Sequence, residues 1–471
     1  MLDKRLWLIL FLGLGLRLIL INQSFWLDEA AQAIESFRPL GQQLDIAGDF
    51  QPPLFHLWVH LFSYFGKSEA WLRSASLIPG MVSIYFIYLI GVMIWNKKAG
   101  LVASLLLATS NFHIFYSQEL RPYMLAAMFA LMSFYYLWRW LVKNDRGPSR
   151  FVFSSIGGIY SMYLYGFFWL GQLLLVLIYH REKLKKFLIG SGLVWLAFMV
   201  WLPKFIIQLK GGIGLIDLLP GWSEAVSVVW YKSVPLIAVK FLVGRVEVDA
   251  IWWQVLSLGL LFLGLGFAIW RTVKVDTKSQ KIAIVVTTSL VTAFVVTLFL
   301  PVIEPKRLLM LLPLLYLLIA RIEVGWGKWL ITLVLLINVV SNVFYWANPR
   351  LQREQWRQAV GYVESKSGLN DAVLFAFPDP FAPWQWYSRG MIDEIDFGKF
   401  RLSDEDRDKI VIRSNQYDRI FVFEYLMDLT DPDRKVFAWL SENGFDRTEV
   451  VNFEGVGMVY VFSKQNVMAA K

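Results

Sequence analysis

Apolar stretches long enough to cross a lipid bilayer recur along the first three quarters of this chain, separated by short clusters of Lys and Arg. A helix needs about 20 largely apolar residues to span the hydrocarbon core, and such stretches are uncommon in soluble domains. Of the 471 residues, 57% are hydrophobic and 18% are charged, whereas about a quarter of a typical soluble domain is charged. The sequence therefore predicts a polytopic α-helical membrane protein.

About eleven transmembrane helices are predicted within residues 1–346. Residues 22–70 carry too many charges to span, and two amphipathic stretches, Leu27–Arg38 and Leu54–Phe65, predict helices that lie in the membrane interface. The predicted spans are Leu6–Ile21, Trp71–Trp95, Ala99–Phe112, Pro122–Val142, Phe151–Tyr165, Gly166–Tyr179, Phe187–Ile207, Ile251–Trp270, Ile282–Leu300, Leu308–Ala320 and Trp329–Trp346.

Lys and Arg set the predicted orientation, because cytoplasmic loops of membrane proteins are enriched in them. Lys4 and Arg5 precede the first span, which places the N-terminus in the cytoplasm. An odd number of spans then places residues 347–471 outside, as an extracytoplasmic or periplasmic domain of a plasma (inner) membrane protein. The predicted inner segments hold Lys97 and Lys98, Lys143–Arg150, Arg181–Lys186, Arg271–Lys281 and Arg321–Lys328.

Residues 347–471 differ in character, because charged residues become frequent and short apolar runs replace the long ones. Strand and helix patterns alternate there and predict a small soluble α/β domain. Asp431 is the predicted N-cap of the second helix, with Pro432 in its first turn. The predicted strands are Asp371–Phe377, Arg419–Phe423 and Gly457–Phe462, and the predicted helices are Trp356–Ser365 and Asp431–Asn443.

The net charge of +9 is of the sign that nucleic-acid-binding proteins carry. Here, however, the basic residues stand at the ends of apolar spans, where the positive-inside rule and anionic headgroups explain them. We therefore predict membrane lipids as partners and no nucleic acid. The chain has no cysteine, which excludes disulfides, lipidated cysteine and thiolate metal ligands.

An acidic pair, Asp28 and Glu29, follows the first predicted span. Carboxylates complement the dipole at the start of a helix, so the pair has a purely structural interpretation. An acidic pair held at the bilayer surface is also costly, and such residues often mark a substrate path. The residues by themselves leave both interpretations open.

Further polar residues recur on the same predicted side of the membrane. Asp49, Gln51 and His56 surround a Pro-Pro pair, which either holds Gln51 extended or merely separates two interfacial helices. Arg73 stands at the outer end of the second span, where a long side chain ordinarily reaches the headgroups. Arg17, within the first span, is about one turn from the helix exit and is expected to do the same.

Two outward turns also carry charge. Glu119, Arg121 and Tyr123 stand around the proline that opens the fourth span, either as an ordinary helix start or as part of a site. Lys306 and Arg307 form a cation pair that runs against the positive-inside trend, and both phosphate and lipid headgroups suit such a pair. Each pattern is unspecific alone, but all of them fall on one predicted side of the membrane.

Five motifs follow one another along the chain. They are Phe25-Trp26-Leu27-Asp28-Glu29-Ala30, Gln51-Pro52-Pro53-Leu54, Trp71-Leu72-Arg73, Tyr116-Ser117-Gln118-Glu119-Leu120-Arg121-Pro122-Tyr123 and Lys306-Arg307-Leu308-Leu309. This ordered set resembles the family 39-like glycosyltransferases, relatives of protein O-mannosyltransferases and of the lipid A aminoarabinose transferase that share the GT-C membrane fold. The resemblance is densest over Leu6–Trp140 and recurs near Pro305–Pro313. It departs at Gln51, where many relatives have His.

The resemblance implies transfer of a sugar from a polyprenyl-phosphate-linked donor to an acceptor hydroxyl on the outer face, with inversion at the anomeric carbon. It implies that Asp28 is the general base that takes the acceptor proton. The leaving phosphate needs charge neutralisation and no proton, so it is expected to meet Lys306 or Arg307, assisted by Arg73 or Arg121.

Other residues are given supporting roles by the same resemblance, and the acceptor is a lipid, a glycan or a protein. The Asp-x-Asp metal motif of the oligosaccharyltransferase branch is not found within residues 1–346, so no cofactor is predicted and a divalent metal is left open. Glu29 and Glu119 complete the predicted catalytic set with Asp28, and the predicted substrate-binding set is Asp49, Gln51, His56, Arg73, Arg121, Tyr123, Lys306 and Arg307.

A transporter or flippase for lipid-linked sugars is the main alternative. Transporters commonly show inverted repeats with charged or helix-breaking residues near the membrane midplane. The sequence shows no convincing repeat, and its main polar groups lie at the outer ends of spans. A third interpretation makes the C-terminal domain a receptor or scaffold and the spans its anchor, although about eleven spans exceed what anchoring requires. The glycosyltransferase is therefore the favoured interpretation.

Overall fold

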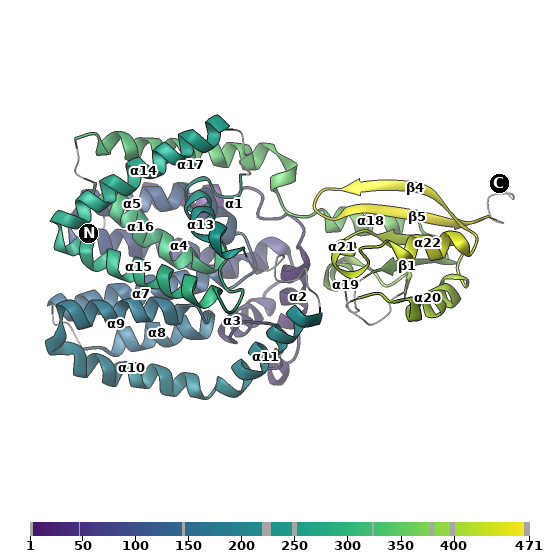
Figure 1. The fold of residues 1–471 in the computed structure, drawn as a ribbon, viewed down its shortest axis with the longest axis horizontal. Coiled ribbons are helices and arrows are strands. Elements are labelled where there is room, and N and C mark those ends of the chain that lie inside the picture. Colours follow the sequence, from purple (N-terminus) through teal and green to yellow (C-terminus); the bar gives the residue numbers. More distant parts are fainter. Residues whose placement is uncertain are drawn as a thin grey trace. The chain divides into compact units, whose positions relative to one another are not determined.

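The structure is a computed structural model that describes residues 3–46, 48–143, 147–218, 228–246, 252–322, 325–376, 381–395 and 401–465. The chain forms two compact units (Figure 1). The first unit comprises Met1–Ile21, Arg38–Gly212 and Glu224–Leu351, and the second comprises Asn22–Phe37, Ile213–Ser223 and Gln352–Lys471. The segment that carries Asp28 and Glu29 therefore groups with the C-terminal part of the chain.

The first unit is built of helices. Its α-helices are α1 (Lys4–Leu18), α3 (Leu54–Ser63), α4 (Glu69–Ile94), α5 (Lys97–Thr109), α6 (Asn111–Ser117), α7 (Tyr123–Lys143), α8 (Ser149–Ser161), α9 (Tyr165–Tyr179), α10 (Leu184–Met199), α11 (Leu202–Leu218, whose last turns count with the second unit), α13 (Trp230–Val243), α14 (Trp252–Val275), α15 (Thr277–Thr297), α16 (Leu312–Ala320) and α17 (Gly327–Ala347). Short 3₁₀ helices are η1 (Leu40–Gln42), η2 (Arg181–Lys183), η3 (Pro305–Leu311) and η4 (Pro349–Leu351).

Each predicted span overlaps a helix, and among the described residues five helices are long and apolar enough to cross a membrane. The number is up to seven if each of two bent pairs counts as one span. The helix pair α5–α6 bends by 62° and the pair α10–α11 by 66°, where the sequence predicted single spans. Apolar side chains of α14 such as Leu260 and Leu263, 61% and 72% exposed, face outward as expected of a helix that meets lipid. The chain is a multi-pass membrane protein.

One helix of the first unit was not predicted. Helix α13 carries Lys232, Pro235 and Lys240 within its length, and these residues interrupt the apolar pattern by which a span is recognised. The predicted span that begins at Ile251 corresponds to α14, although Ile251 itself lies outside the described residues.

Arg17 corrects a prediction made from the sequence. Its side chain does not reach toward headgroups but is fully buried. The guanidinium donates to the carbonyl oxygens of Gly13 at 2.8 Å, Ala108 at 2.9 Å and Leu107 at 3.3 Å, and to Ser117 Oγ at 3.1 Å. Three of these acceptors belong to α5 and α6, so one side chain joins α1 to the bend between them. Sequence could not reveal this, because the acceptors are backbone carbonyls about ninety residues away.

The second unit contains a five-stranded sheet with strand order β2-β1-β3-β5-β4. The pairs β1–β2 and β1–β3 are parallel, whereas β3–β5 and β4–β5 are antiparallel. The strands are β1 (Asp371–Phe375), β2 (Asp393–Ile395), β3 (Arg419–Phe423), β4 (Phe445–Phe453) and β5 (Gly457–Lys464). The helices are α2 (Leu27–Ser36), α18 (Trp356–Lys366), α19 (Ala382–Tyr387), the 3₁₀ helix η5 (Asp404–Asp406), α20 (Arg407–Ser414), α21 (Met427–Thr430) and α22 (Lys435–Glu442).

Alternate residues of the central strand β3 point into two separate cores. Phe421 and Phe423 pack with Trp356 and other residues of α18 and α19. Ile420 and Val422 pack with residues of α20 and α22 on the opposite face. The period-2 alternation of a strand thus produces a three-layer arrangement of helices, sheet and helices. The predicted α/β character of the C-terminal part is confirmed.

The strand predictions at β1, β3 and β5 hold, although Phe377, the predicted end of the first strand, lies outside the described residues. The predicted helix start at Asp431 is wrong. Helix α22 begins at Lys435, because Arg434 adopts a left-handed conformation with φ of 54°. Asp431 still satisfies the helix start, since its carboxylate accepts the backbone N–H groups of Lys435 at 2.9 Å and Val436 at 3.1 Å.

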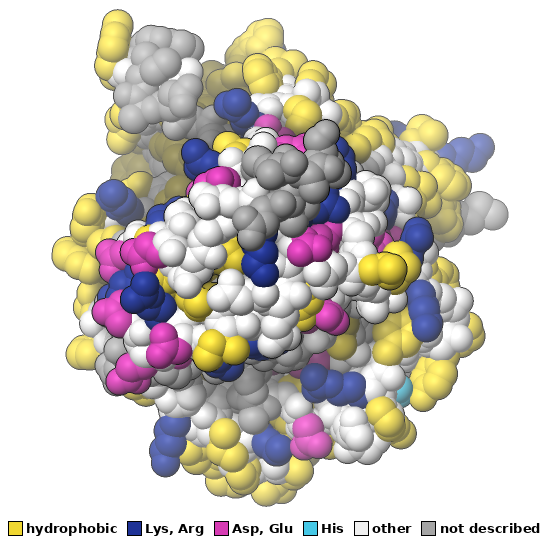
Figure 2. All heavy atoms as spheres, turned by 90° about the vertical axis from the view of Figure 1, so that its right-hand side faces the viewer, with side chains coloured by type: hydrophobic (Ala, Val, Ile, Leu, Met, Phe, Trp, Pro, Cys, Tyr) yellow, Lys and Arg dark blue, Asp and Glu magenta, His cyan; other side chains and the backbone are white. Residues whose placement is uncertain are grey.

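Figure 2 shows a face of the protein on which acidic and basic side chains are interspersed. On the second unit such side chains form ion pairs, among them Arg434–Asp428 at 2.7 Å and Lys435–Asp404 at 2.8 Å. A surface of mixed charge is typical of a domain in contact with water.

Replacing Val422 by Ala tests whether the sheet core stabilises the second unit. Val422 is fully buried in β3, so the change should lower the free energy of unfolding by about 2 kcal/mol through lost burial and a residual cavity. The matched control is Val450→Ala in edge strand β4, where the side chain is 43% exposed and the expected cost is below about 1 kcal/mol. Urea-dependent proteolysis of the full chain in detergent measures both, and equal losses would contradict this account of the core.

Candidate functional site

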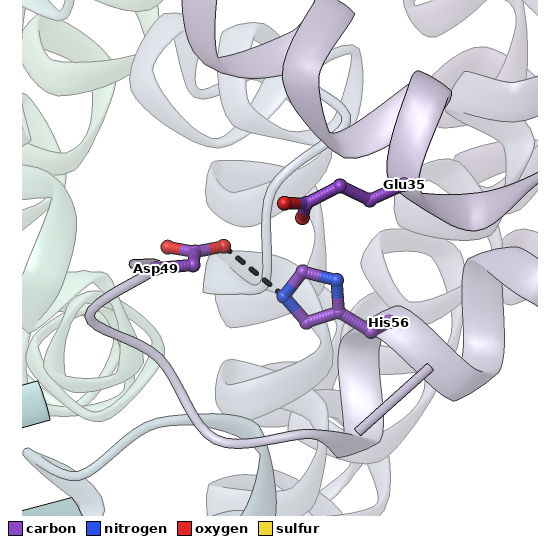
Figure 3. A group of neighbouring side chains, drawn as sticks. All are labelled: Glu35, Asp49 and His56. Atoms are coloured by element: carbon purple, nitrogen blue, oxygen red, sulfur yellow. Dashed lines mark hydrogen bonds and ion pairs between the residues drawn. The ribbon is translucent and has the colours of Figure 1, made fainter. Parts of the chain in front are cut away.

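The segment between η1 and α3 brings Asp49, Gln51 and His56 together in the first unit. The residue before a proline is confined to extended conformations, and the Pro-Pro pair after Gln51 therefore keeps α3 from starting before Leu54. His56 then lies in the first turns of α3, fully buried, with Nε2 at 3.0 Å from Asp49 Oδ2 (Figure 3). The Gln51 side chain contacts both partners, at 3.0 Å from His56 Nε2 and in a hydrogen bond to Asp49 Oδ2.

Asp49 also pairs with Arg121, whose guanidinium lies 3.7 Å from Asp49 Oδ1. Burial raises the pKa of the Asp49 carboxyl, but the Arg121 charge and the hydrogen bond from His56 outweigh burial and lower it. The carboxylate is therefore held in its ionised form. This pairing joins two of the motifs found in the sequence, since Arg121 lies seventy-two residues beyond Asp49.

Gln208 of α11 fixes the backbone of the same segment. Its Nε2 donates to the carbonyl oxygens of Ile46 at 2.8 Å and Gln51 at 3.1 Å, and also to that of Asp49. Tyr163 donates its hydroxyl to Gln208 Oε1 at 2.5 Å and accepts from Trp201 Nε1 at 2.9 Å. A buried amide thus replaces water as the partner of three loop carbonyls.

The turn between α6 and α7 places the second group of sequence-predicted residues. Helix α7 begins at Tyr123, so Glu119 lies before the helix. Glu119 and Tyr123 therefore do not share a helical face, as they would if the helix began earlier. Glu119 is buried, and its backbone carbonyl accepts from the Arg121 N–H at 2.7 Å. The Arg121 side chain turns to Asp49 instead.

Lys306 interacts electrostatically with Glu119 and Tyr123 of this turn. Its Nζ lies 2.9 Å from Glu304 Oε1, at the start of η3. Burial opposes the charge, but Tyr123, Glu304 and Glu119 act in the other direction and raise the pKa of Lys306 above its usual range. Lys306 therefore stays protonated, with an acidic and phenolic environment around it.

Arg307 and Arg73 occupy different surroundings. Arg307 Nε lies 3.9 Å from Glu304 Oε2, and its guanidinium donates to the carbonyl oxygens of Pro301 and Val302, each at 3.2 Å. Arg73 is fully buried and donates to the Ile21 carbonyl oxygen at 2.8 Å. The ordinary expectation that Arg73 reaches headgroups is therefore wrong, because its side chain satisfies a backbone carbonyl just after α1.

Asp28 and Glu29 lie in the first turn of α2 in the second unit, where the positive end of the helix dipole stabilises negatively charged carboxylates. The residues before them form hydrogen bonds with the C-terminal part of the chain. Gln23 donates to Gln352 Oε1 at 2.7 Å, and the Phe25 N–H donates to the Tyr387 hydroxyl at 2.6 Å. Two segments more than three hundred residues apart thereby fix where α2 begins.

Of the eleven sequence-predicted site residues, nine belong to the first unit and Asp28 and Glu29 belong to the second. Two residues that matter for these groups were not predicted. Glu304 stands beside the predicted cation pair and had a signal in its Glu-Pro-Lys-Arg context. Gln208 had none, because it acts through contacts with residues about 160 positions away in the sequence.

Asp49 and His56 offer a carboxylate oxygen and an imidazole nitrogen, both of which divalent metals accept. They are two ligands, whereas catalytic metal sites usually draw three from the protein. Glu35, the third side chain in Figure 3, comes from α2 of the second unit.

Comparison with known proteins supports the resemblance found in the sequence. A family model described as dolichyl-phosphate-mannose-protein mannosyltransferase matches residues 51–207. That range holds Gln51, His56, Arg73, Glu119 and Arg121, and hence most of the site in the first unit. No curated protein matches the sequence significantly.

Solved structures match over nearly the whole chain. ArnT from Cupriavidus metallidurans bound to undecaprenyl phosphate superposes with a TM-score of 0.58 at 9% identity, covering 98% of this chain and 97% of that one. Its apo form gives 0.55 at 10% identity, covering 97% and 96%. The chain has the GT-C fold. An oligosaccharyltransferase from Archaeoglobus fulgidus in complex with Zn and sulfate gives 0.53 at 11% identity, covering 98% of this chain and 73% of that one.

These matches confirm two predictions from the sequence. The resemblance to GT-C glycosyltransferases is confirmed by the family model and by the shared fold. The fold class, a helical membrane part with a small C-terminal sheet domain, is confirmed as well. The prediction of about eleven transmembrane helices stays a prediction.

Replacing Gln208 by Leu tests how the segment with Asp49 is held. The change removes the donor to three loop carbonyls, so the backbone of residues 48–51 should open more often and its amides should exchange about tenfold faster. Hydrogen exchange of the full chain in lipid nanodiscs, followed by mass spectrometry, measures this. Gln254→Leu in α14 is the control, and unchanged exchange in Gln208→Leu would contradict the role given to Gln208.

Proposed function

We propose that this protein is a glycosyltransferase that moves a sugar from a polyprenyl-phosphate-linked donor to an acceptor hydroxyl. The observation that carries the proposal is the GT-C fold, shared along the whole chain with ArnT in its complex with undecaprenyl phosphate. The family model adds support, because its description names a dolichyl-phosphate sugar and its match covers the cluster of Gln51, His56 and Arg121. A transferase for a hexose or a pentose fits this proposal.

Asp28 is the proposed general base. An acceptor hydroxyl attacks the anomeric carbon as the Asp28 carboxylate takes its proton, and the bond from that carbon to the phosphate oxygen breaks. Attack from the face opposite the phosphate inverts the anomeric configuration. Glu29 and Glu119 are proposed to orient hydroxyl groups of sugar or acceptor, as carboxylates accept such hydrogen bonds.

The leaving polyprenyl phosphate carries its own negative charge and needs a cation. Lys306 is the proposed partner, because its environment keeps it protonated, and Arg307 is its neighbour in η3. Lys306 pairs with Glu304 at 2.9 Å in the structure, so donor binding would exchange a carboxylate partner for a phosphate partner. Arg73 and Arg121 are proposed to assist less directly, since both already bond within the protein.

Asp49, Gln51, His56 and Tyr123 are proposed to bind the sugar or the acceptor. The ionised Asp49 and the amide of Gln51 are acceptor and donor groups that suit sugar hydroxyls. Their fixed backbone, held through Gln208, favours a preorganised site. The acceptor is proposed to be a lipid, a glycan or a protein.

The proposed location follows from the basic loops. The N-terminus and the loops rich in Lys and Arg would face the cytoplasm, and the transfer would occur on the outer face of the plasma membrane. Residues 1–346 would form the GT-C transmembrane catalytic domain, and residues 347–471 an extracytoplasmic α/β domain.

A transporter or flippase for lipid-linked sugars is the second candidate. It is favoured by one observation, the fully buried Arg17 within α1, because charges inside membrane spans often mark a transport path. Every bond of Arg17 described above, however, ends on backbone or side chains of the first unit, as expected of a structural charge.

Replacing Asp28 by Asn tests the proposed base. Asn keeps the shape of the side chain but has no carboxylate to take a proton, so sugar transfer should fall by about a hundredfold or more. The assay uses purified full-length protein in lipid, radiolabelled polyprenyl-phosphate sugars and acceptor fractions from the outer face. The control is Asp45→Asn, a change at an exposed residue that pairs with Lys204 at 3.5 Å, which should leave transfer unchanged.

Equal transfer by the wild type and Asp28→Asn would move the base to another residue, with Glu29 or Glu119 next. No transfer from any donor, together with movement of intact donor across the bilayer, would establish the flippase instead.

Replacing Lys306 and Arg307 together by Ala tests the phosphate site. Loss of the charge-assisted contacts should weaken donor binding by about tenfold to a hundredfold. Binding of a fluorescent polyprenyl-phosphate sugar to the protein in nanodiscs measures the change. Lys97→Ala with Lys98→Ala removes an equally adjacent cation pair at the start of α5 and should leave affinity unchanged. Unaltered affinity in the Lys306 and Arg307 variant would show that the phosphate binds elsewhere.

A further inference from the structure

A row of hydrogen bonds within the second unit joins residues 22–25 to residues 352–357. Gln23 Oε1 accepts from the Arg353 N–H at 3.3 Å, and the Ser24 hydroxyl donates to the Glu354 carbonyl oxygen. The Arg357 guanidinium donates to the Asn22 carbonyl oxygen at 3.2 Å. Together with the bonds of Gln23 and Phe25 described above, this row fixes the approach to α2 immediately before Asp28.

The side chain of Glu354 lies in this row and ends among aromatic partners. Trp356 Nε1 donates to Glu354 Oε2 at 2.7 Å, and the Tyr425 hydroxyl donates to Glu354 Oε1 at 3.2 Å. Gly455 leaves room for it, because a Cβ there would come within 2.8 Å of Glu354 Cγ. Leu27, the residue before Asp28, packs against the same aromatic core as Trp356 and Tyr425. The Glu354 carboxyl is thus fixed within a dense cluster next to the start of α2.

Three charged or titratable groups act on Glu354 from the elements around it. The pKa of Glu354 is raised to about 7, chiefly by burial and to a smaller extent by the charge of the Asp28 carboxylate. The hydrogen bonds from Trp356 and Tyr425 and the Arg353 charge oppose the rise. The Asp28 carboxylate therefore acts electrostatically on the Glu354 carboxyl within this cluster.

We propose that Glu354 is a positioning residue for Asp28. Through it, the C-terminal part of the second unit acts on the acidic pair Asp28 and Glu29 of the same unit. The row of bonds sets where Asp28 stands, and the Glu354 carboxyl sets the charge beside it. The inference rests on the proposed function, because it gives the C-terminal part of the chain a role in the proton transfer from the acceptor to Asp28.

The proposed step gains from a charge at Glu354. When Asp28 takes the proton of the acceptor hydroxyl, one anion of a neighbouring pair becomes neutral. When Glu354 is ionised, protonation of Asp28 removes the repulsion between two negative charges and is therefore favoured. When Glu354 is protonated, there is no such repulsion to remove. Transfer should therefore rise as Glu354 ionises around pH 7.

Glu354→Gln tests the proposal through the pH profile. The amide still accepts a hydrogen bond but never ionises, so kcat/KM should lose its rise near pH 7 and fall about threefold to tenfold above that pH. The matched control is Glu364→Gln in α18, the helix that begins two residues after Glu354, where the Glu364 carboxyl accepts the Arg389 N–H at 2.6 Å. A purely structural role for Glu354 would lower activity at every pH and keep the inflection. A profile equal to that of the wild type, or one lowered uniformly, would overturn the proposal.

An infrared titration of the full chain in lipid separates this proposal from the proposed function, because it needs no activity. The carboxylic acid C=O band of Glu354 should titrate with a midpoint near pH 7 and be absent in Glu354→Gln. Asp28→Asn should shift the midpoint down, since Asp28 raises the pKa of Glu354. Tyr425→Phe should shift the midpoint up, because it removes a hydrogen bond that stabilises the ionised form of Glu354. This variant tests the proposal if Glu354→Gln does not fold.

A midpoint that ignores Asp28→Asn would overturn the link between the two carboxyl groups even if sugar transfer is found. The expected shifts in a protein that transfers no sugar would refute the proposed function and leave the pair intact.

Discussion

Backbone carbonyls at irregular points of the helical unit must find donors within the protein, because an apolar surrounding offers no water to bond them. Long polar side chains supply these donors. Gln118 donates to the carbonyl oxygens of Arg17 and Ile19 at the end of α1, and Arg73 donates to Ile21 just beyond. Asn342 of α17 donates at 2.8 Å to Thr109, where α5 ends. The end of α1 and the end of α5 are thus each tied to a side chain from another element.

The same constraint positions the candidate site. The segment that carries Asp49 runs without regular structure, and Gln208 is the side chain that satisfies its carbonyls. Once the segment is fixed, Asp49 can hold His56 and Arg121 at the same time. The same network of polar side chains therefore satisfies the irregular backbone within the helical unit and forms the candidate site.

The sequence was informative wherever the signal was local. Long apolar runs predicted the helices, short apolar runs predicted β1, β3 and β5, and the ordered motifs indicated the GT-C fold. Contacts between distant segments left no such signal, as for Arg17, whose carbonyl partners no pattern distinguishes. Strand β4 escaped prediction because most of its residues are exposed at the sheet edge and lack an apolar pattern. The start of α22 was missed because a left-handed Arg434 delays it after Asp431 and Pro432.

The fate of the lipid donor tests the central claim most directly. Purified protein in proteoliposomes would be given a polyprenyl-phosphate sugar and an outer-face acceptor fraction, and the lipid would be followed by mass spectrometry. The account predicts that free polyprenyl phosphate appears in equal amount to the sugar gained by the acceptor. A donor that remains intact, whether it stays in one leaflet or moves to the other, would contradict it.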